Sequence, residues 1–253
     1  MKAILYIIFI TAGFVLGSFL NVVIYRLPRK ISIVTPFSFC PNCKAGIKFY
    51  DNIPLLSFLI LKGKCRNCKI KIPARYPIVE TVSAVLFALN FHYFGISPAC
   101  LSGILLSIAL IIVSFIDMEL QLIPNVIVLP FTLIGLAISL VINISSDWRG
   151  WWIPLAYTVG AFLFMFIINL IYPKGMGMGD VKLSMMAGAF LSEKIIPGLF
   201  IGFLAGSIIG ISLIVFKKKK FRQSIAFGPF ISFGCIAALF YGDKIINWYL
   251  SLI

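Results

Sequence analysis

The stretch Gly175-Met176-Gly177-Met178-Gly179-Asp180 stands immediately before a hydrophobic run and combines pliable backbone with a carboxylate. Glycine has no Cβ atom, so it tolerates positive φ angles and lets another backbone come close. The carboxylate would lie at the start of the next helix, where the positive end of the helix dipole favours an anion. Asp180 is therefore either a helix cap or part of a functional site at a membrane edge.

Four cysteines form two Cys-x-x-Cys pairs that are separated by residues 44–64, namely Cys40, Cys43, Cys65 and Cys68. This spacing is typical of a tetrahedral four-thiolate zinc site. The alternatives are a redox pair or free thiols, but in a cytoplasmic loop, the location expected below, thiols stay reduced and a metal is favoured. Because cysteine fills all four coordination positions, we expect the zinc to be structural rather than catalytic.

The composition indicates a membrane protein, because 61% of the residues are hydrophobic and only 12% are charged. Soluble domains carry about 25% charged residues. Apolar runs long enough to cross a bilayer recur along the chain, whereas the short alternating segments of a membrane β-barrel do not occur. The net charge of +14 is carried between these runs, which indicates a topology signal and no nucleic-acid partner.

We expect an all-α polytopic membrane protein in the lipid bilayer, with about eight transmembrane helices at residues 3–25, 78–94, 98–116, 123–143, 152–172, 181–192, 196–216 and 224–242. The segment 181–192 is short for a full crossing. The first run lacks the basic start and the cleavage site of a signal peptide, so it is expected to be retained. The predicted domains are the first helix at 1–25, a small cytoplasmic zinc-knuckle insert at 26–77 and a transmembrane core at 78–253.

The positive-inside rule fixes the orientation of these helices. With the basic insert in the cytoplasm, eighteen of the 22 Lys and Arg residues lie inside, and those outside are Lys2, Arg149, Lys194 and Lys244. The same topology places Asp117, at the end of the third helix, and Asp180 at cytoplasmic helix ends of similar depth. Two acids from distant parts of the sequence on one membrane face favour a paired-carboxylate site.

Several motifs occur in order, and in combination they resemble those of the type IV prepilin peptidases, also called prepilin leader peptidases/N-methyltransferases. The resemblance runs from about residue 13 to 190 and is carried by Gly17–Pro28, the two cysteine pairs, Ala74–Glu80, Asp117 followed by Ile123-Pro124-Asn125, and Gly175–Asp180. Where this chain reads Ile-Pro-Asn after the first aspartate, a Leu-Pro-Asp ending is common in the family. The change keeps a polar residue and a proline that can start the next helix.

The resemblance implies an intramembrane aspartic protease of the GxGD type, with Asp117 and Asp180 as the catalytic acids of a peptidase core at 78–253. Such enzymes cut the basic leader from type IV prepilins or pseudopilins after a glycine, on the cytoplasmic face of the inner membrane. Many members then methylate the new N-terminal amine with S-adenosylmethionine. The four cysteines match the metal-binding knuckles of the longer members, which have both activities.

Three further polar residues near the cytoplasmic face each have two interpretations. Glu80 would pair with an arginine such as Arg75, or it would take part in catalysis. Asn21 and Arg26 would serve methylation or simply anchor the first helix at the membrane interface. The sequence has no glycine-rich nucleotide loop after a strand, so it does not predict which residues bind S-adenosylmethionine.

Three other functions are compatible with parts of the sequence. A GxGD protease of the signal-peptide-peptidase type would lack both the cysteine pairs and the segment Gly17–Asn21. An ion- or proton-coupled membrane transporter with paired carboxylates would place its acids near the midplane and repeat broken helices in matching halves. A zinc-dependent scaffold without chemistry would work without either aspartate.

Overall fold

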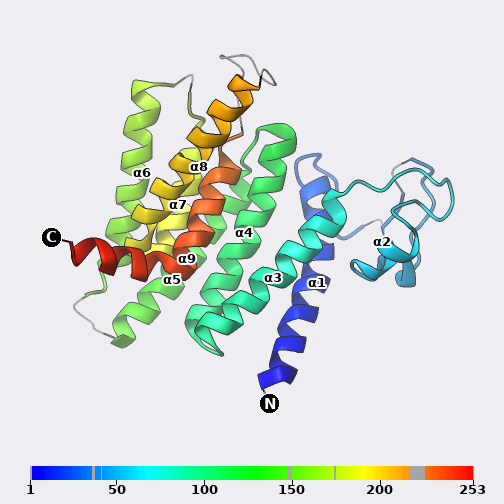
Figure 1. Cartoon of the computed structure of the whole chain (residues 1–253), viewed down its shortest axis with the longest axis horizontal. Helices are drawn as coiled ribbons and strands as arrows, with labels where there is room; N and C mark the ends of the chain where they lie inside the picture. Colours follow the sequence, from blue (N-terminus) through cyan, green and yellow to red (C-terminus); the bar gives the residue numbers. More distant parts are fainter. Residues whose placement is uncertain are drawn as a thin grey trace. The chain divides into compact units, whose positions relative to one another are not determined.

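The computed structural model describes residues 2–35, 38–40, 42–146, 150–173, 175–216 and 226–252. These residues form long helices with short connections and only two isolated β-bridges (Figure 1). The long helices are α1 (Lys2–Arg26), α3 (Arg75–Phe94), α4 (Pro98–Leu120), α5 (Asn125–Ser146), α6 (Ile153–Ile171), α7 (Met178–Leu191), α8 (Ile195–Val215) and α9 (Gly228–Leu250). The short ones are η1 (Phe49–Asn52), α2 (Leu56–Ile60) and η3 (Ser192–Lys194). The all-α prediction is confirmed.

Seven regions of the described chain are long and apolar enough to cross a membrane. Each of the eight predicted apolar segments corresponds to a helix, but α7 and α8 are joined by η3 and count as one region, Met178–Leu213. Helix α7 has 14 residues, which span about 21 Å at 1.5 Å per residue. That length is less than the roughly 30 Å of a bilayer core, so α7 alone is too short to cross it.

The chain divides into two compact units, Met1–Ile96 and Ser97–Ile253. The first unit contains α1, α3 and the cysteine-bearing insert, and the second contains α4 to α9. The predicted functional division at residues 25 and 77 differs from this division by contacts and stays a prediction.

In the first unit, α1 and α3 pack closely in antiparallel directions because glycines on α1 face the α3 backbone. A Cβ added at Gly17 would lie 2.8 Å from the Cα of Glu80, and one added at Gly13 would overlap the Cα of Ala84. Small residues at such a crossing let two membrane helices approach and gain van der Waals contact. The insert leaves this pair at the end of α1 and returns to it at the start of α3.

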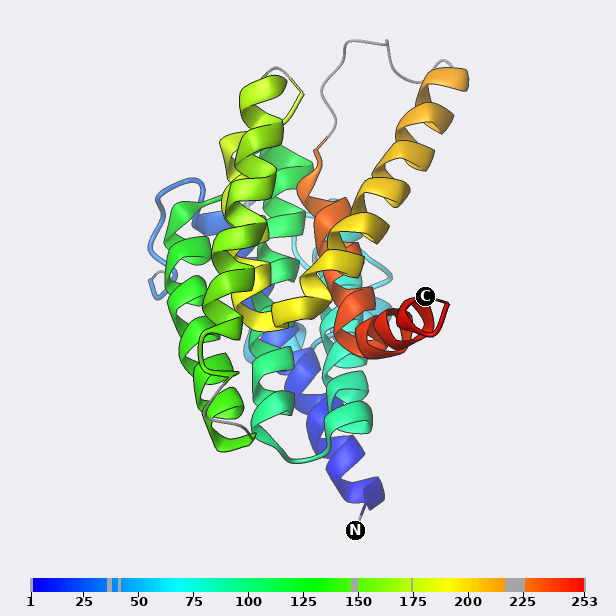
Figure 2. The ribbon, with the colours of Figure 1, turned by 90° about the vertical axis from the view of Figure 1, so that its left-hand side faces the viewer.

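In the second unit, α7 is the central helix and packs against α4, α5, α6, α8 and α9 (Figure 1). Its buried hydroxyl-bearing neighbours tie it in place, since Ser139 of α5 donates to the Ala189 carbonyl at 2.8 Å. Gly188 faces α6 so closely that an added Cβ would lie 2.8 Å from the Tyr157 carbonyl oxygen. Helices α8 and α9 cross at a second glycine contact, between Gly198 and Gly234 (Figure 2). This packing holds the start of α7 beside the ends of α4 and α9.

Candidate active site and metal centre

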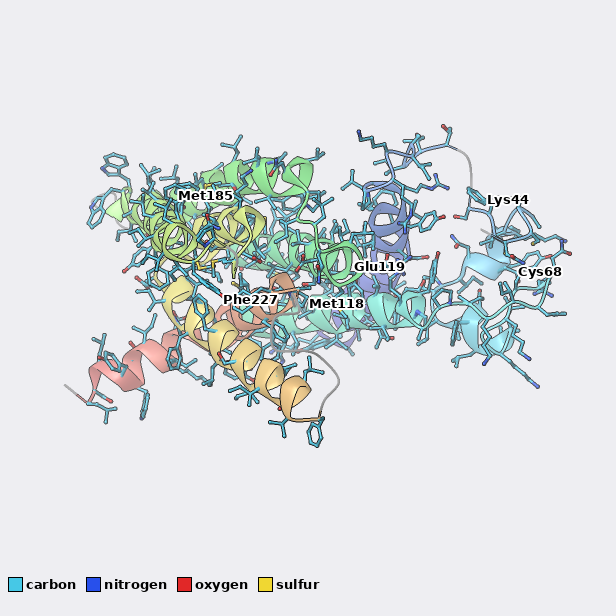
Figure 3. The ribbon with its side chains drawn as sticks, turned by 90° about the horizontal axis from the view of Figure 1, so that it is seen from above. Lys44, Cys68, Met118, Glu119, Met185 and Phe227 are labelled. Carbon is cyan, nitrogen blue, oxygen red and sulfur yellow. The ribbon has the colours of Figure 1, made fainter. Side chains whose placement is uncertain are left out.

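Asp117 lies in the last turn of α4 and is 5% exposed. Its Oδ2 accepts a hydrogen bond of 2.9 Å from the backbone N–H of Gly228, a residue 111 positions later in the chain. Phe227, the residue that precedes α9, lies near Met118 in Figure 3, in agreement with this bond. The start of α9 therefore positions the Asp117 carboxylate.

Gly228 is a site residue that the sequence analysis missed. A Cβ at this position would lie 2.8 Å from Asp117 Oδ2 and 3.2 Å from its Cγ, so the carboxylate occupies the space that any side chain would need. The sequence feature that could have indicated Gly228 is the Gly228-Pro229 pair. Proline is common at the start of a helix, where the first backbone N–H groups have no partner within the helix and can donate to another group. The family resemblance, which ended near residue 190, did not extend to it.

Asp180 is the third residue of α7 and is 8% exposed. Gly177 is the N-cap of the helix, and its N–H donates to Asp180 Oδ2 at 3.2 Å while the Asp180 N–H donates to the Gly177 carbonyl at 3.0 Å. The other oxygen, Oδ1, is buried and has no hydrogen-bond partner among the described residues. Asp180 is therefore not the N-cap that one interpretation expected, but one of its oxygens accepts from the N-cap N–H, and the second is left for another partner.

Of the two properties of glycine considered for the stretch before Asp180, tolerance of positive φ angles is not used there. Positive φ occurs at Gly63 and Gly95 among the described glycines, and Gly177 has φ −80°. Close approach is the requirement at Gly179 instead, where an added Cβ would lie 2.8 Å from the Cβ of Ile123. At Gly177 the same atom would meet nothing nearer than 3.6 Å, so the backbone beside the carboxylate is open.

The loop between α4 and α5 supports the start of α7. Ile123 contacts Gly179, and Asn125, the first residue of α5, accepts a hydrogen bond of 3.1 Å from Lys182 Nζ. On the other side, Asn169 of α6 donates to the Met176 carbonyl at 2.6 Å. The Ile-Pro-Asn segment therefore positions the second acid even though it follows the first.

The two carboxylates belong to one site. Asp117 and Asp180 are close enough to interact electrostatically, and neither has a cationic partner within the described ranges. A buried charge is costly unless it is paired, so two uncompensated acids side by side are expected only where the fold uses them for something other than stability.

The other polar residues singled out by the sequence contact the first unit's own backbone. Glu80 Oε2 accepts a hydrogen bond of 2.7 Å from the Leu55 N–H of the insert. Asn21 donates to the carbonyls of Gly17 and Tyr76, and Arg26 donates to the Ser32 carbonyl at 2.9 Å. These contacts favour the anchoring interpretation of Asn21 and Arg26.

The four cysteines meet at one point of the insert. Their Sγ atoms all lie within 4.8 Å of one another, and Cys40 Sγ is 3.8 Å from Cys68 Sγ. A Zn–S distance of about 2.3 Å in a tetrahedron places the sulfurs roughly 3.8 Å apart, so the cluster fits a zinc ion. Cys68 and Lys44 lie at the end of the insert that is away from α1 (Figure 3).

The two knuckles have the same local structure. Lys44 and Lys69 follow the second cysteine of each pair and adopt φ 59° and 58°. Each donates its N–H to the carbonyl of the first cysteine of its pair, Cys40 or Cys65. Such left-handed residues are unfavourable without glycine, and a bound metal offsets this cost by tying the turn at both ends.

The ionisation of the thiols favours a cation. Hydrogen bonds from the Ile70 backbone and the Asn42 side chain lower the pKa of Cys68 to about 6. A hydrogen bond from the Ala45 backbone acts the same way at Cys43, but desolvation and the neighbouring sulfurs outweigh it and raise its pKa to about 11. Crowded thiolates of this kind need a metal charge to coexist, and metal binding releases their protons.

Two family models match the chain in succession. The Bacterial Peptidase A24 N-terminal domain matches residues 11–94, and the Type IV leader peptidase family matches residues 104–215. The chain belongs to the type IV leader peptidase family. The second match contains both Asp117 and Asp180, and the first contains all four cysteines.

Relatives that align with most of this chain share one name, prepilin leader peptidase/N-methyltransferase. The protein of Bacillus subtilis (strain 168) is 36% identical, with 95% of this chain and 96% of the relative covered. The Legionella pneumophila protein is 35% identical, with 93% of this chain and 91% of the relative covered. The Pseudomonas aeruginosa protein is 33% identical, with 96% of this chain and 92% of the relative covered. No solved structure matches the chain.

We expect the purified chain to carry one zinc ion per molecule and Cys68→Ala to lose it, because three thiolates leave the tetrahedron open. The matched control is Cys235→Ala, which removes a buried thiol from α9 and leaves the knuckles intact. Elemental analysis of the detergent-purified variants measures the metal. A native chain without zinc, or a Cys68→Ala variant with its full complement, would contradict the metal centre.

Proposed function

We propose that the chain removes the leader peptide from type IV prepilins or pseudopilins, cutting after a glycine at the cytoplasmic face of the inner membrane. Asp117 and Asp180 are the catalytic pair in this proposal. It is supported by the family membership, by the shared name of the relatives and by the geometry of the two acids. The new N-terminal amine is then methylated.

The observation that carries the proposal is the buried pair itself. Asp117 and Asp180 come from different helices and interact with each other. One oxygen of each accepts a hydrogen bond from a single backbone N–H. Asp180 Oδ1 is left unpartnered. A structural pair would be expected to have cations or more donors, whereas a catalytic pair needs free oxygens for water and substrate.

Two such carboxylates can share one proton, because like charges a few ångströms apart do not both ionise easily. The ionised member takes a proton from water, and the water oxygen attacks the scissile carbonyl carbon. The protonated member donates a hydrogen bond to the carbonyl oxygen as negative charge develops there. The carbon–nitrogen bond then breaks, the leaving amine receives the proton, and the pair returns to its singly protonated state.

The location of the pair agrees with cleavage near a membrane surface. Asp117 is three residues before the end of α4 at Leu120, and Asp180 is two residues after the start of α7 at Met178. Acids at the midplane, as in the transporter alternative, would lie near the middle of their helices. The charge asymmetry of the loops assigns this end to the cytoplasm.

Methylation is the second activity in the proposal and uses S-adenosylmethionine as a second substrate. This donor supplies a methyl group to the free amine, and the products are S-adenosylhomocysteine, the N-methylated chain and a proton. The relatives' shared name supports this step. No residue of the chain is assigned to the donor.

We expect Asp117→Asn and Asp180→Asn each to lower prepilin cleavage by about 10²- to 10⁴-fold, the usual contribution of a general acid or base. Amides of the same shape keep the packing but cannot exchange the proton. Mass spectrometry of a type IV prepilin incubated with each variant measures the product, and S-adenosylmethionine adds the mass of one methyl group with the native chain.

Glu119→Gln is the control for this experiment, because Glu119 lies two residues from Asp117 on the same helix and is exposed. It should keep native cleavage. Cleavage that persists in both aspartate variants would overturn the pair, and a native chain that cleaves no prepilin would return the scaffold and transporter functions to consideration.

The open backbone at Gly177 gives a second prediction for the same assay. A leucine there would fill the space beside Asp180 Oδ2, where an extended substrate strand must come close, so Gly177→Leu should lower turnover at least about tenfold. Gly177→Ala, whose Cβ makes only ordinary contacts, should keep most activity. Both variants should melt within a few degrees of the native chain, and native turnover by Gly177→Leu would exclude substrate approach at this residue.

A further inference from the structure

The insert of the first unit exposes a cluster of large apolar side chains between residues 49 and 60. Phe49 is 86% exposed and Ile60 is 74% exposed, and Ile53, Leu56 and Leu59 are exposed with them. Neighbouring apolar residues of this number are unusual on a surface that meets only water. They lie on η1, on α2 and on the turn between these two short helices.

The depth of this cluster follows from its attachment to α3. Glu80 Oε2 accepts a hydrogen bond of 2.7 Å from the backbone N–H of Leu55, the residue that precedes α2. Glu80 is five residues after Arg75, the first residue of α3, which places it about 7.5 Å along the helix at 1.5 Å per residue. Because α3 is a candidate membrane span, α2 lies at the level of the bilayer edge. Figure 1 shows α2 beside the end of the α1–α3 pair from which the insert emerges.

The attachment is built into the backbone. Leu55 has φ 60°, a conformation that costs energy for a branched residue and persists only where neighbours enforce it. Glu80 is buried, and it enforces the conformation through its hydrogen bond. Ser57 also donates to the Tyr50 carbonyl at 2.9 Å, which ties α2 to η1. The apolar cluster is therefore held at a fixed depth.

The charge around the cluster indicates an anionic neighbour. Residues 42–71 contain seven basic side chains, Lys44, Lys48, Lys62, Lys64, Arg66, Lys69 and Lys71, against the single acid Asp51. Asp51 is already paired with Arg66, with 2.6 Å between Oδ1 and a guanidinium nitrogen. The other bases therefore face outward with no acid of the insert to neutralise them. Apolar side chains rimmed by lysines are typical of segments that lie in the surface of an anionic membrane.

We propose that residues 49–60 form an interfacial anchor that inserts Phe49, Leu56, Leu59 and Ile60 into the acyl edge of an anionic phospholipid leaflet. Interfacial helices bury their apolar face about 5–10 Å into this boundary, and the bond to Glu80 would hold α2 near the start of α3, where such a boundary is expected. The cysteine cluster is then held against the membrane surface rather than in the cytoplasm at large. The proposal is independent of the peptidase activity.

The test places a photoreactive p-benzoylphenylalanine at Leu59 in the full chain, reconstituted in vesicles of phosphatidylcholine with phosphatidylglycerol. The matched control has the probe at Asn67, an exposed residue between the cysteines of the second knuckle. Zinc content confirms that each variant has folded. Mass spectrometry after irradiation identifies what the probe has captured.

We expect a phospholipid adduct at Leu59 on the order of tenfold above that at Asn67, because the first probe lies among acyl chains and the second in water. The adduct should fall several-fold in vesicles of phosphatidylcholine alone, since the lysine rim then has no anionic lipid. Capture of a second copy of the chain, capture of residues 97–253, or equal adducts at both positions would each overturn the anchor. Equal yields in the two kinds of vesicle would overturn its preference for anionic lipid.

Discussion

Two buried carboxylates that must stay close together constrain the whole second unit. Asp117 and Asp180 would repel each other if both were charged, and burial removes the water that would screen them. The fold supplies one backbone N–H to each acid, from Gly228 and from Gly177. Neither donor carries a full charge, so a proton shared by the two acids, as proposed, would relieve their repulsion.

This constraint explains why three separate helix ends meet at one place. Helix α4 contributes Asp117 from its last turn, α7 contributes Asp180 from its first, and α9 begins with the glycine that leaves room for a carboxylate. Helix α7 packs against five other helices and is only 14 residues long. Its neighbours hold its N-terminus, and hence Asp180, beside the end of α4 and the start of α9.

The insert of the first unit has little hydrophobic core, so it needs other interactions to hold a fixed structure. The cysteine cluster closes one end of the insert, and the bond from Leu55 to Glu80 fixes the other to α3. Glu80, for which the sequence left an arginine partner or catalysis open, accepts this bond from a backbone N–H. With a zinc ion at the cysteines and the proposed anchor, the insert would be held by metal, by protein and by lipid at three different points.

Much of this structure could be predicted from the sequence. Each apolar run gives a helix, because burial in a bilayer leaves the backbone few alternatives. The ends agree with the prediction within about four residues, except that α9 continues to Leu250 where the prediction ended at 242. The loop charges suggested that Asp117 and Asp180 share a face, and the cysteine spacing predicted the cluster. Gly228 was missed because it meets Asp117 across 111 residues, a contact that no local pattern encodes.

The glycines of the Gly175–Asp180 stretch show a second limit of sequence reasoning. Their presence indicated pliable or closely packed backbone, but only the structure distinguishes the two, and at Gly179 the close packing is against Ile123. The insert was read as polar and cytoplasmic because of its many basic residues, although Leu55–Leu61 is a short apolar run. The exposure of Phe49, Leu56, Leu59 and Ile60 could not be read from the sequence, because it depends on the fold of the insert.

The most direct measurement is the cleavage rate of the double variant Asp117→Asn/Asp180→Asn beside its two parents, in one membrane preparation with one prepilin. Two acids that act as one proton-sharing unit lose their function together, so the double variant should be no slower than the slower single variant. Losses that multiply in the double variant would mean that the two acids act independently, which would contradict a shared catalytic pair.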